Sequence, residues 1–184
     1  VGALKAFTYN EKLPLHETLG TFGVVLDGNI YHSSNVLMIE YANYLAEKYN
    51  LKFVLRLHPK NDEDDYIPLC NKRYLIKTLS KVENKKYAEI VDFSLVHMTG
   101  VFVELLSINS PMFLMKDEFL EDIFAIPGAS FSNENELSGI YEYFISNIRG
   151  FASVQYDLYR QFNEAGSLKQ NYKNAVEKIL GNAL

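Results

Sequence analysis

Two stretches of the sequence place a histidine directly after an apolar run. Residues 51–60, LKFVLRLHPK, end in His58 and its cationic neighbours, and residues 93–100, FSLVHMTG, continue an apolar run into His97. A histidine among cations can hold an anionic group such as a phosphate, or can move a proton near neutral pH. The two stretches are therefore the first candidates for a functional site.

Each candidate also has a structural alternative, because a histidine that ends a strand is commonly a loop residue or a hydrogen-bonded core residue. A zinc site needs three or more ligands, and the four histidines are scattered without ligand spacing, so we expect no metal. His16 and His32 have no such context and are interpreted as surface residues. The single cysteine, Cys70, is interpreted as a small packing residue and fits a reducing compartment.

The elements that must position the histidines alternate between strands and helices. A strand is expected at 22–26, and a helix with apolar residues three or four positions apart on one face runs from a cap at Ser33 or Ser34 to Asn50. The next strand, 52–57, follows at once. This spacing is typical of a right-handed crossover between parallel strands.

The rest of the chain continues the alternation, apart from an acidic surface loop at 60–68. Further strands are expected at about 74–78, 93–96, 111–115 and 129–131, and further helices at about 84–91, 101–108, 134–147, 151–163 and 167–180. The pattern predicts an α/β fold, a Rossmann-like three-layer domain with a mostly parallel sheet and C-terminal helices.

In a parallel sheet, ligands bind outside the carboxyl ends of the strands. His58 and His97 both follow predicted strands, so we expect them at the same edge. Gly28 and Asn29 follow the first strand and either line this edge or form an ordinary turn. Arg56, with Pro59 and Lys60 beyond His58, would add positive charge there.

The stretch HMTG also opens a helix. Thr99 can cap that helix, Gly100 lets a ligand approach the backbone closely, and Met98 lies beside them, so the helix start would suit an anion. Glu104 is the single charge in VFVELLSI. It could accept a hydrogen bond from a ribose hydroxyl, or it could pair with Arg56 or a backbone group.

Composition excludes several classes of protein. The chain has 184 residues and a net charge of −5, which argues against a general nucleic-acid binder. No apolar run approaches the roughly 20 residues of a membrane span, and no Gly-rich dinucleotide or phosphate-loop motif follows a strand. Residues 1–20 are interpreted as a linker or domain boundary, and 21–184 as the folded domain.

The order of these motifs resembles the C-terminal nucleotide-binding half of bacterial GT-B glycosyltransferases. The similarity is to capsule, lipooligosaccharide and teichoic-acid enzymes, including sialyltransferases and CDP-glycerol glycerophosphotransferases. Their His-Pro pair corresponds to His58 and Pro59, their helix-opening hydroxyl to Thr99, their acid to Glu104, and their small-residue-Pro step to 109–111. Met98 departs from this pattern, because a serine is usual there. The resemblance covers roughly residues 21–132.

The resemblance implies a donor-binding domain that acts on a CMP-, CDP- or UDP-sugar and uses no other cofactor. His58 would contact the nucleotide or its phosphate and is also the candidate catalytic residue. Thr99 and the Gly100 amide would hold the phosphate, and Glu104 the ribose. The acceptor half and the glycan acceptor would belong to a larger two-domain protein, so this chain alone would lack activity.

The resemblance further implies a bacterial enzyme of surface-polysaccharide synthesis, in the cytoplasm or at the inner face of the membrane. Two alternatives stay open. The chain could be a non-catalytic α/β module for assembly or regulation, or half of a sugar-nucleotide epimerase of the same architecture.

Overall fold

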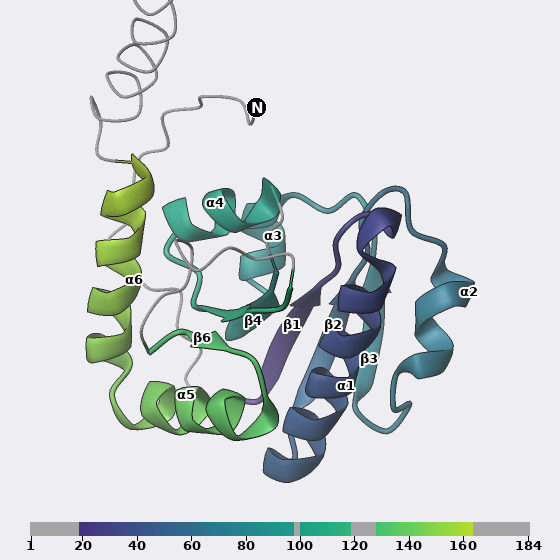
Figure 1. Cartoon of the computed structure of the whole chain (residues 1–184), viewed down its shortest axis with the longest axis horizontal. Helices are drawn as coiled ribbons and strands as arrows, with labels where there is room; N and C mark the ends of the chain where they lie inside the picture. The colour runs from purple at the N-terminus through teal and green to yellow at the C-terminus, as the bar shows by residue number, and fades with distance from the viewer. Residues whose placement is uncertain (1–18, 98–99, 119–127, 164–184) are drawn as a thin grey trace, which may run out of the picture.

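The central sheet of the protein is entirely parallel over the part of the chain that is described. A computed structural model describes residues 19–97, 100–118 and 128–163. Its strands are β1 (Thr21–Val25), β2 (Lys52–Arg56), β3 (Leu75–Leu79), β4 (Phe93–Val96), β5 (Met112–Met115) and β6 (Ser130–Phe131). They lie in the order β3-β2-β1-β4-β5-β6, which confirms the predicted Rossmann-like fold (Figure 1).

Helices cover both faces of this sheet. They are α1 (His32–Tyr49), α2 (Glu63–Tyr66), α3 (Asn84–Ala88), α4 (Gly100–Ser107), α5 (Glu134–Ser146) and α6 (Ile148–Asn163), with short 3-10 turns η1 (Asn29–Tyr31) and η2 (Ile67–Leu69). Helix α1 contacts α5, and α3 contacts α4. Right-handed crossovers in opposite directions from β1 and β4 place α1 and α4 on opposite faces. The predicted helix at 167–180 and most of the 1–20 segment lie outside the described residues.

The predicted ends of the long helix α1 were half right. Asn50 closes it in the left-handed conformation, with φ of 53°, as expected. The predicted cap at Ser33 or Ser34 is wrong, because the helix begins at His32 and Tyr31 is its N-cap. Ser34 is buried, and its hydroxyl donates to Asp117 instead of capping the helix.

The acidic segment after β2 is not simply a loop, as the sequence had suggested. Residues Glu63–Tyr66 form one helical turn, and the Asp62 carboxylate caps it by accepting from the Asp64 amide at 3.1 Å. Tyr66 is fully buried and fixes this turn to the body of the domain. An acidic first turn is also favourable beside the positive end of the helix dipole.

A row of phenylalanines crosses the buried centre of the sheet. Phe22 in β1 lies between Phe53 of β2 and Phe93 of β4, with ring centroids 5.6 and 5.2 Å away, and Phe113 stacks on Phe93 at 4.6 Å. The registers Phe22–Phe53 and Phe22–Phe93 put neighbouring side chains on one face of the sheet. Aromatic pairs at these separations add to the stability gained from burial alone.

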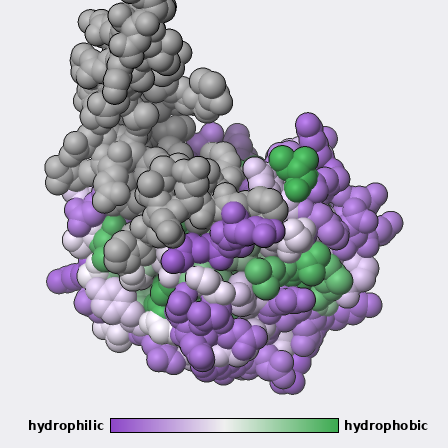
Figure 2. Space-filling view, viewed as in Figure 1, coloured by the Kyte–Doolittle hydropathy of each residue, from purple (hydrophilic) through white to green (hydrophobic). Residues whose placement is uncertain are grey.

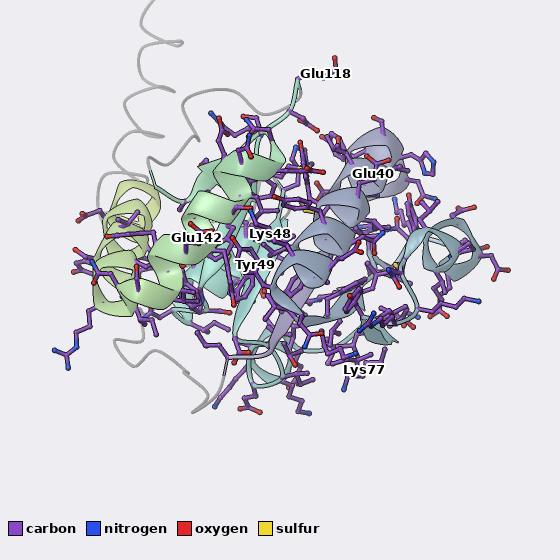
Figure 3. All side chains as sticks on the ribbon, turned by 90° about the horizontal axis from the view of Figure 1, so that it is seen from below. Glu40, Lys48, Tyr49, Lys77, Glu118 and Glu142 are labelled. Atoms are coloured by element: carbon purple, nitrogen blue, oxygen red, sulfur yellow. The ribbon has the colours of Figure 1, made fainter. Side chains whose placement is uncertain are left out.

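The face of the sheet that carries α1 is closed by contacts between α1 and α5. Tyr49 Oη donates to Glu142 Oε1 at 2.6 Å, and Lys48 Nζ donates to Ser138 Oγ at 2.9 Å. Figure 3 shows Lys48, Tyr49 and Glu142 where the two helices meet. Helix α5 begins at its predicted cap, where Asn133 accepts from the Glu136 amide.

One face of the molecule is mainly polar where its residues are described. Figure 2 shows hydrophilic residues over most of the coloured part of this face, with apolar residues in a few patches. No helix in the described ranges combines the length and the apolar character needed to span a bilayer. The predicted site residues His58 and His97 follow β2 and β4 at the carboxyl edge, which is the edge where the carboxyl ends of the strands lie.

Candidate nucleotide-binding site

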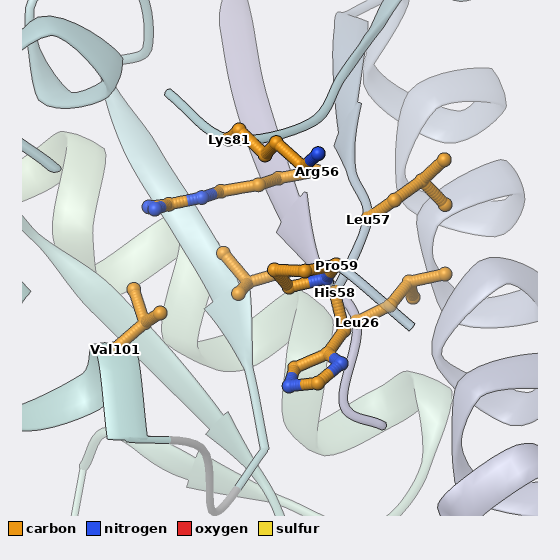
Figure 4. A pocket seen from close by; sticks show the side chains of 8 residues that line it. Leu26, Arg56, Leu57, His58, Pro59, Lys81 and Val101 are labelled. Atoms are coloured by element: carbon orange, nitrogen blue, oxygen red, sulfur yellow. The ribbon is translucent and has the colours of Figure 1, made fainter. Parts of the chain in front are cut away.

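A pocket of about 240 Å³ opens at the carboxyl edge of the sheet. The residues that line it come from the ends of β1, β2 and β3 and from the first turn of α4: Val25, Leu26, Arg56, Leu57, His58, Pro59, Lys81 and Val101. Figure 4 shows how these side chains surround the cavity. The structure therefore brings the His-Pro pair and the start of α4 together, although about 40 residues separate them in the sequence.

Arg56 is the last residue of β2, and its guanidinium reaches into this pocket (Figure 4). Its Nη2 donates to the Val82 carbonyl at 3.0 Å, and its Cζ lies 4.8 Å from the centre of the Tyr87 ring. Its Nη1 is buried and has no hydrogen-bond partner among the described residues. Burial lowers the pKa of Arg56, but a guanidinium stays charged at neutral pH.

His58 follows β2 and is half-buried in the same pocket. Its Nδ1 accepts from the Lys60 amide at 3.2 Å, so the proton of the neutral ring lies on Nε2. Nε2 makes no hydrogen bond to any residue in the described ranges and can donate to a ligand. Gly28 lies against the ring, since a Cβ built there would be 3.6 Å from it.

Lys81 is a pocket residue that sequence reasoning missed. It follows β3 and has a left-handed backbone, with φ of 55°, which a non-glycine residue rarely adopts. Its place shortly after the strand expected at about 74–78 was a usable signal. That strand was expected to be parallel to the strand that precedes His58. Without the order of the strands, nothing indicated that β3 lies beside β2.

The electrostatic character of the pocket is positive. Arg56, His58 and Lys81 line it, and none of the eight described lining residues is acidic. Val101 belongs to the first turn of α4, whose N-terminus carries the positive end of the helix dipole. A half-buried guanidinium that forms no ion pair with a described carboxylate is costly to bury unless an anion binds. The arrangement therefore suits an anionic ligand.

The second histidine is used differently. His97 is buried at the end of β4, and its Nδ1 donates to Asp27 Oδ2 at 2.7 Å while its Nε2 donates to Asp117 Oδ1 at 3.0 Å. Asp27 follows β1 and Asp117 follows β5, so the cluster joins three neighbouring strand ends. Neither carboxylate was singled out from the sequence, although both follow strands.

The two carboxylates favour the protonated form of His97. Burial alone would lower the pKa of His97, but the hydrogen bonds and charges of Asp27 and Asp117 outweigh it and raise the pKa above its usual value. Both ring nitrogens donate, as an imidazolium requires. Among the described residues there is no group of side chains arranged as a metal site.

Further hydrogen bonds fix the Asp27–His97–Asp117 cluster from both sides. The Asn35 side chain bonds to the backbone of Asp27 through both its oxygen and its nitrogen, at 2.8 and 2.9 Å. Ser34 Oγ donates to Asp117 Oδ2 at 2.5 Å. Helix α1 thus holds the ends of β1 and β5, and the geometry favours the structural alternative for His97.

The other predicted site residues fall into three groups. Glu104 in α4 accepts from Asn84 Nδ2, a partner that the sequence did not suggest. Asn29 and Lys60 are exposed beside the pocket and do not line it. Met98 and Thr99 lie outside the described residues, and Gly100 begins α4 as expected.

Comparisons with known proteins support the fold. No protein-family model matches the sequence, and no curated protein matches it. The chain is similar to the solved catalytic domain of cholesterol-α-glucosyltransferase from Helicobacter pylori, with 16% identity and a TM-score of 0.53 over 77% of this chain and 97% of that one.

Two further solved structures carry glycosyltransferase ligands. TarM from S. aureus, solved with fondaparinux, α-GlcNAc-glycerol and UDP, has 13% identity and a TM-score of 0.54 over 91% of this chain. The pneumococcal O-GlcNAc transferase GtfA, solved with UDP and GlcNAc, has 13% identity and a TM-score of 0.54 over 95% of it. The matched regions are 36% and 38% of those two chains, so this chain spans little more than a third of their length. The domain shares the fold of GT-B glycosyltransferases.

Proposed function

We propose that this chain is the donor-binding domain of a glycosyltransferase that builds a bacterial surface polysaccharide. One observation carries the proposal: a pocket at the carboxyl edge is lined by Arg56, His58 and Lys81 and by no described acidic side chain. Ligands of this fold bind at the carboxyl ends of the strands, so the phosphates of a CMP-, CDP- or UDP-activated sugar would lie at this pocket. A glycerophosphotransferase with a CDP-linked donor would use the same pocket.

The pocket residues would act on the leaving group. As the bond between the anomeric carbon and the phosphate oxygen breaks, negative charge grows on that oxygen. His58 Nε2–H would donate to it, and the cations of Arg56 and Lys81 would stabilise the charge. The acceptor hydroxyl forms the new bond, and its proton passes to a base outside this chain, in an acceptor domain of a larger protein.

Calorimetry with CMP, CDP, UDP and GDP tests this proposal. We expect at least one to bind, and we expect His58→Ala to weaken it by about 1.5–3 kcal/mol, which is the value of a hydrogen bond to a charged group. His32→Ala is the matched control, because His32 is also a histidine but lies at the start of α1, where it is exposed and bonds to Tyr66.

A second pair of variants tests the positive pocket. Lys81→Ala should weaken the same nucleotide, and Lys77→Ala should not, because Lys77 is exposed on β3 and does not line the pocket (Figure 3). Failure of all four nucleotides to bind would overturn the proposal. Equal affinity of wild type and His58→Ala would instead favour a non-catalytic module.

A further inference from the structure

We propose that Tyr87 is a positioning residue that holds the Arg56 guanidinium in place for an anionic ligand. The inference rests on the proposed function and adds to it the residue that prepares the anion contact. Tyr87 lies in α3, outside the group of residues that line the pocket. It acts through Arg56, whose Cζ lies 4.8 Å from the centre of its ring.

Tyr87 is itself rigidly held. Its side chain is fully buried, and its hydroxyl lies 3.1 Å from Ser94 Oγ in β4. The ring passes over β1 at Gly23, where a Cβ would come within 1.7 Å of the Tyr87 hydroxyl oxygen. A side chain at position 23 would displace the ring, so this glycine is required for a close approach.

The guanidinium is fixed by two contacts, and one of its amino groups is left without a hydrogen-bond partner among the described residues. The Tyr87 ring holds its face, and the Val82 carbonyl accepts from Nη2 at 3.0 Å. Nη1 is buried and has no partner among the described residues, while the guanidinium extends into the pocket (Figure 4). An arginine ordered before binding loses less side-chain entropy when the anion arrives.

No described carboxylate makes an ion pair with Arg56. Glu104 is near enough to favour the charged guanidinium, but its hydrogen bond is with Asn84. An aromatic ring attracts a cation without neutralising it, so the full charge stays available to an anion. Tyr87 can therefore orient Arg56 without weakening the attraction between the guanidinium and a phosphate. A carboxylate in the same place would neutralise the guanidinium.

Binding of pyrophosphate to the whole chain tests the inference, because pyrophosphate carries no base. We expect Arg56→Ala to weaken it about tenfold or more, and Tyr87→Leu to weaken it about threefold to thirtyfold, the range of a cation–π contact. Tyr87→Phe keeps the ring and should bind within about twofold of wild type. Ser94→Ala, which removes only the partner of the hydroxyl, should do the same.

The double variant Arg56→Ala, Tyr87→Leu separates positioning from general damage. If Tyr87 acts through Arg56, the double variant binds pyrophosphate no more weakly than Arg56→Ala alone. Additive losses would overturn the inference, and so would unchanged binding by Tyr87→Leu. In either case His58→Ala would still weaken nucleotide binding, so the proposed function would stand.

A measurement on the wild-type chain decides the matter even if Tyr87→Leu does not fold. The Arg56 side-chain resonances, assigned by their loss in Arg56→Lys, should be shifted by the ring current of Tyr87. Resonances at the positions of a free arginine would overturn the inference. If wild type binds neither pyrophosphate nor any nucleotide, the proposed function fails, and the ring-current shift still reports on the contact between the two side chains.

Discussion

The strand ends at His58 and His97 look alike in the sequence and differ in the folded protein. Both are histidines after apolar strands, at the same edge of one parallel sheet. His58 is half-buried, and its Nε2 is unpaired within the described ranges, whereas His97 is buried with both nitrogens donating to carboxylates. The difference comes from the neighbouring strand ends.

The position of each strand in the sheet explains why the neighbours differ. β4 lies between β1 and β5, so the residues after both strands, Asp27 and Asp117, reach His97. β2 lies between β1 and β3. Gly28 follows β1 and Lys81 follows β3, and a cavity lies beside His58. Two carboxylates bond to both ring nitrogens of His97 and favour its protonated form, whereas no described carboxylate bonds to His58, whose Nε2 stays open to a ligand.

Replacing His97 should cause the largest loss of stability. His97→Ala removes the imidazolium that the buried Asp27 carboxylate and the partly buried Asp117 carboxylate share, and we expect the free energy of unfolding to fall by about 3–5 kcal/mol. Urea denaturation measures this loss. His58→Ala is the matched control and should change stability by no more than about 0.5 kcal/mol. Equal losses for the two variants would contradict the comparison.

Removing a hydrogen bond at the rim of the same cluster should cost less. Ser34→Ala deletes the donor to Asp117, and a hydrogen bond to a charged group is worth about 1.5–3 kcal/mol. Ser33→Ala, one position away and exposed, is the control. If denaturation shows no difference between the two serine variants, Ser34 does not support the cluster.

Stability should also depend on pH through His97. Its pKa is raised in the folded state above the value of about 6.5 in the unfolded chain, so its contribution is complete below pH of about 6.5. That contribution is lost as the pH rises through the folded pKa. Within the described part of the chain, Tyr31, Asp27 and Asp117 face the ring. We expect the free energy of unfolding to decline above pH 6.5 in wild type and in His58→Ala, with no matching decline in His97→Ala.

The smallest effect is expected beside His58. Gly28 has φ of −61°, which any residue adopts, and an added Cβ would make ordinary contact with the ring at 3.6 Å. Gly28→Ala should therefore change the free energy of unfolding by less than about 0.5 kcal/mol. Gly23→Ala is the contrasting variant, since its Cβ would overlap Tyr87, and overpacking typically costs about 1–3 kcal/mol. Similar stabilities for the two variants would show that the edge and the core are equally tolerant.

Much of the fold could be predicted from local patterns. The predicted strands at 93–96 and 111–115 and the caps at Asn50 and Asn133 agree with the structure because apolar runs and capping residues act on their own neighbours. The cap at Ser33 or Ser34 failed because a distant residue, Asp117, competes for the Ser34 hydroxyl. Local signals fail where a tertiary contact offers a better partner.

The sequence by itself determined the α/β alternation and the placing of His58, Arg56 and His97 at the ends of strands. Only the tertiary structure decided which of them is available to a ligand. Strand order is set by long-range packing, and it brings Lys81 to Arg56 and two aspartates to His97. The charge state and accessibility of a side chain depend on neighbours within a few ångströms in space, and the spacing of residues along a chain does not specify them.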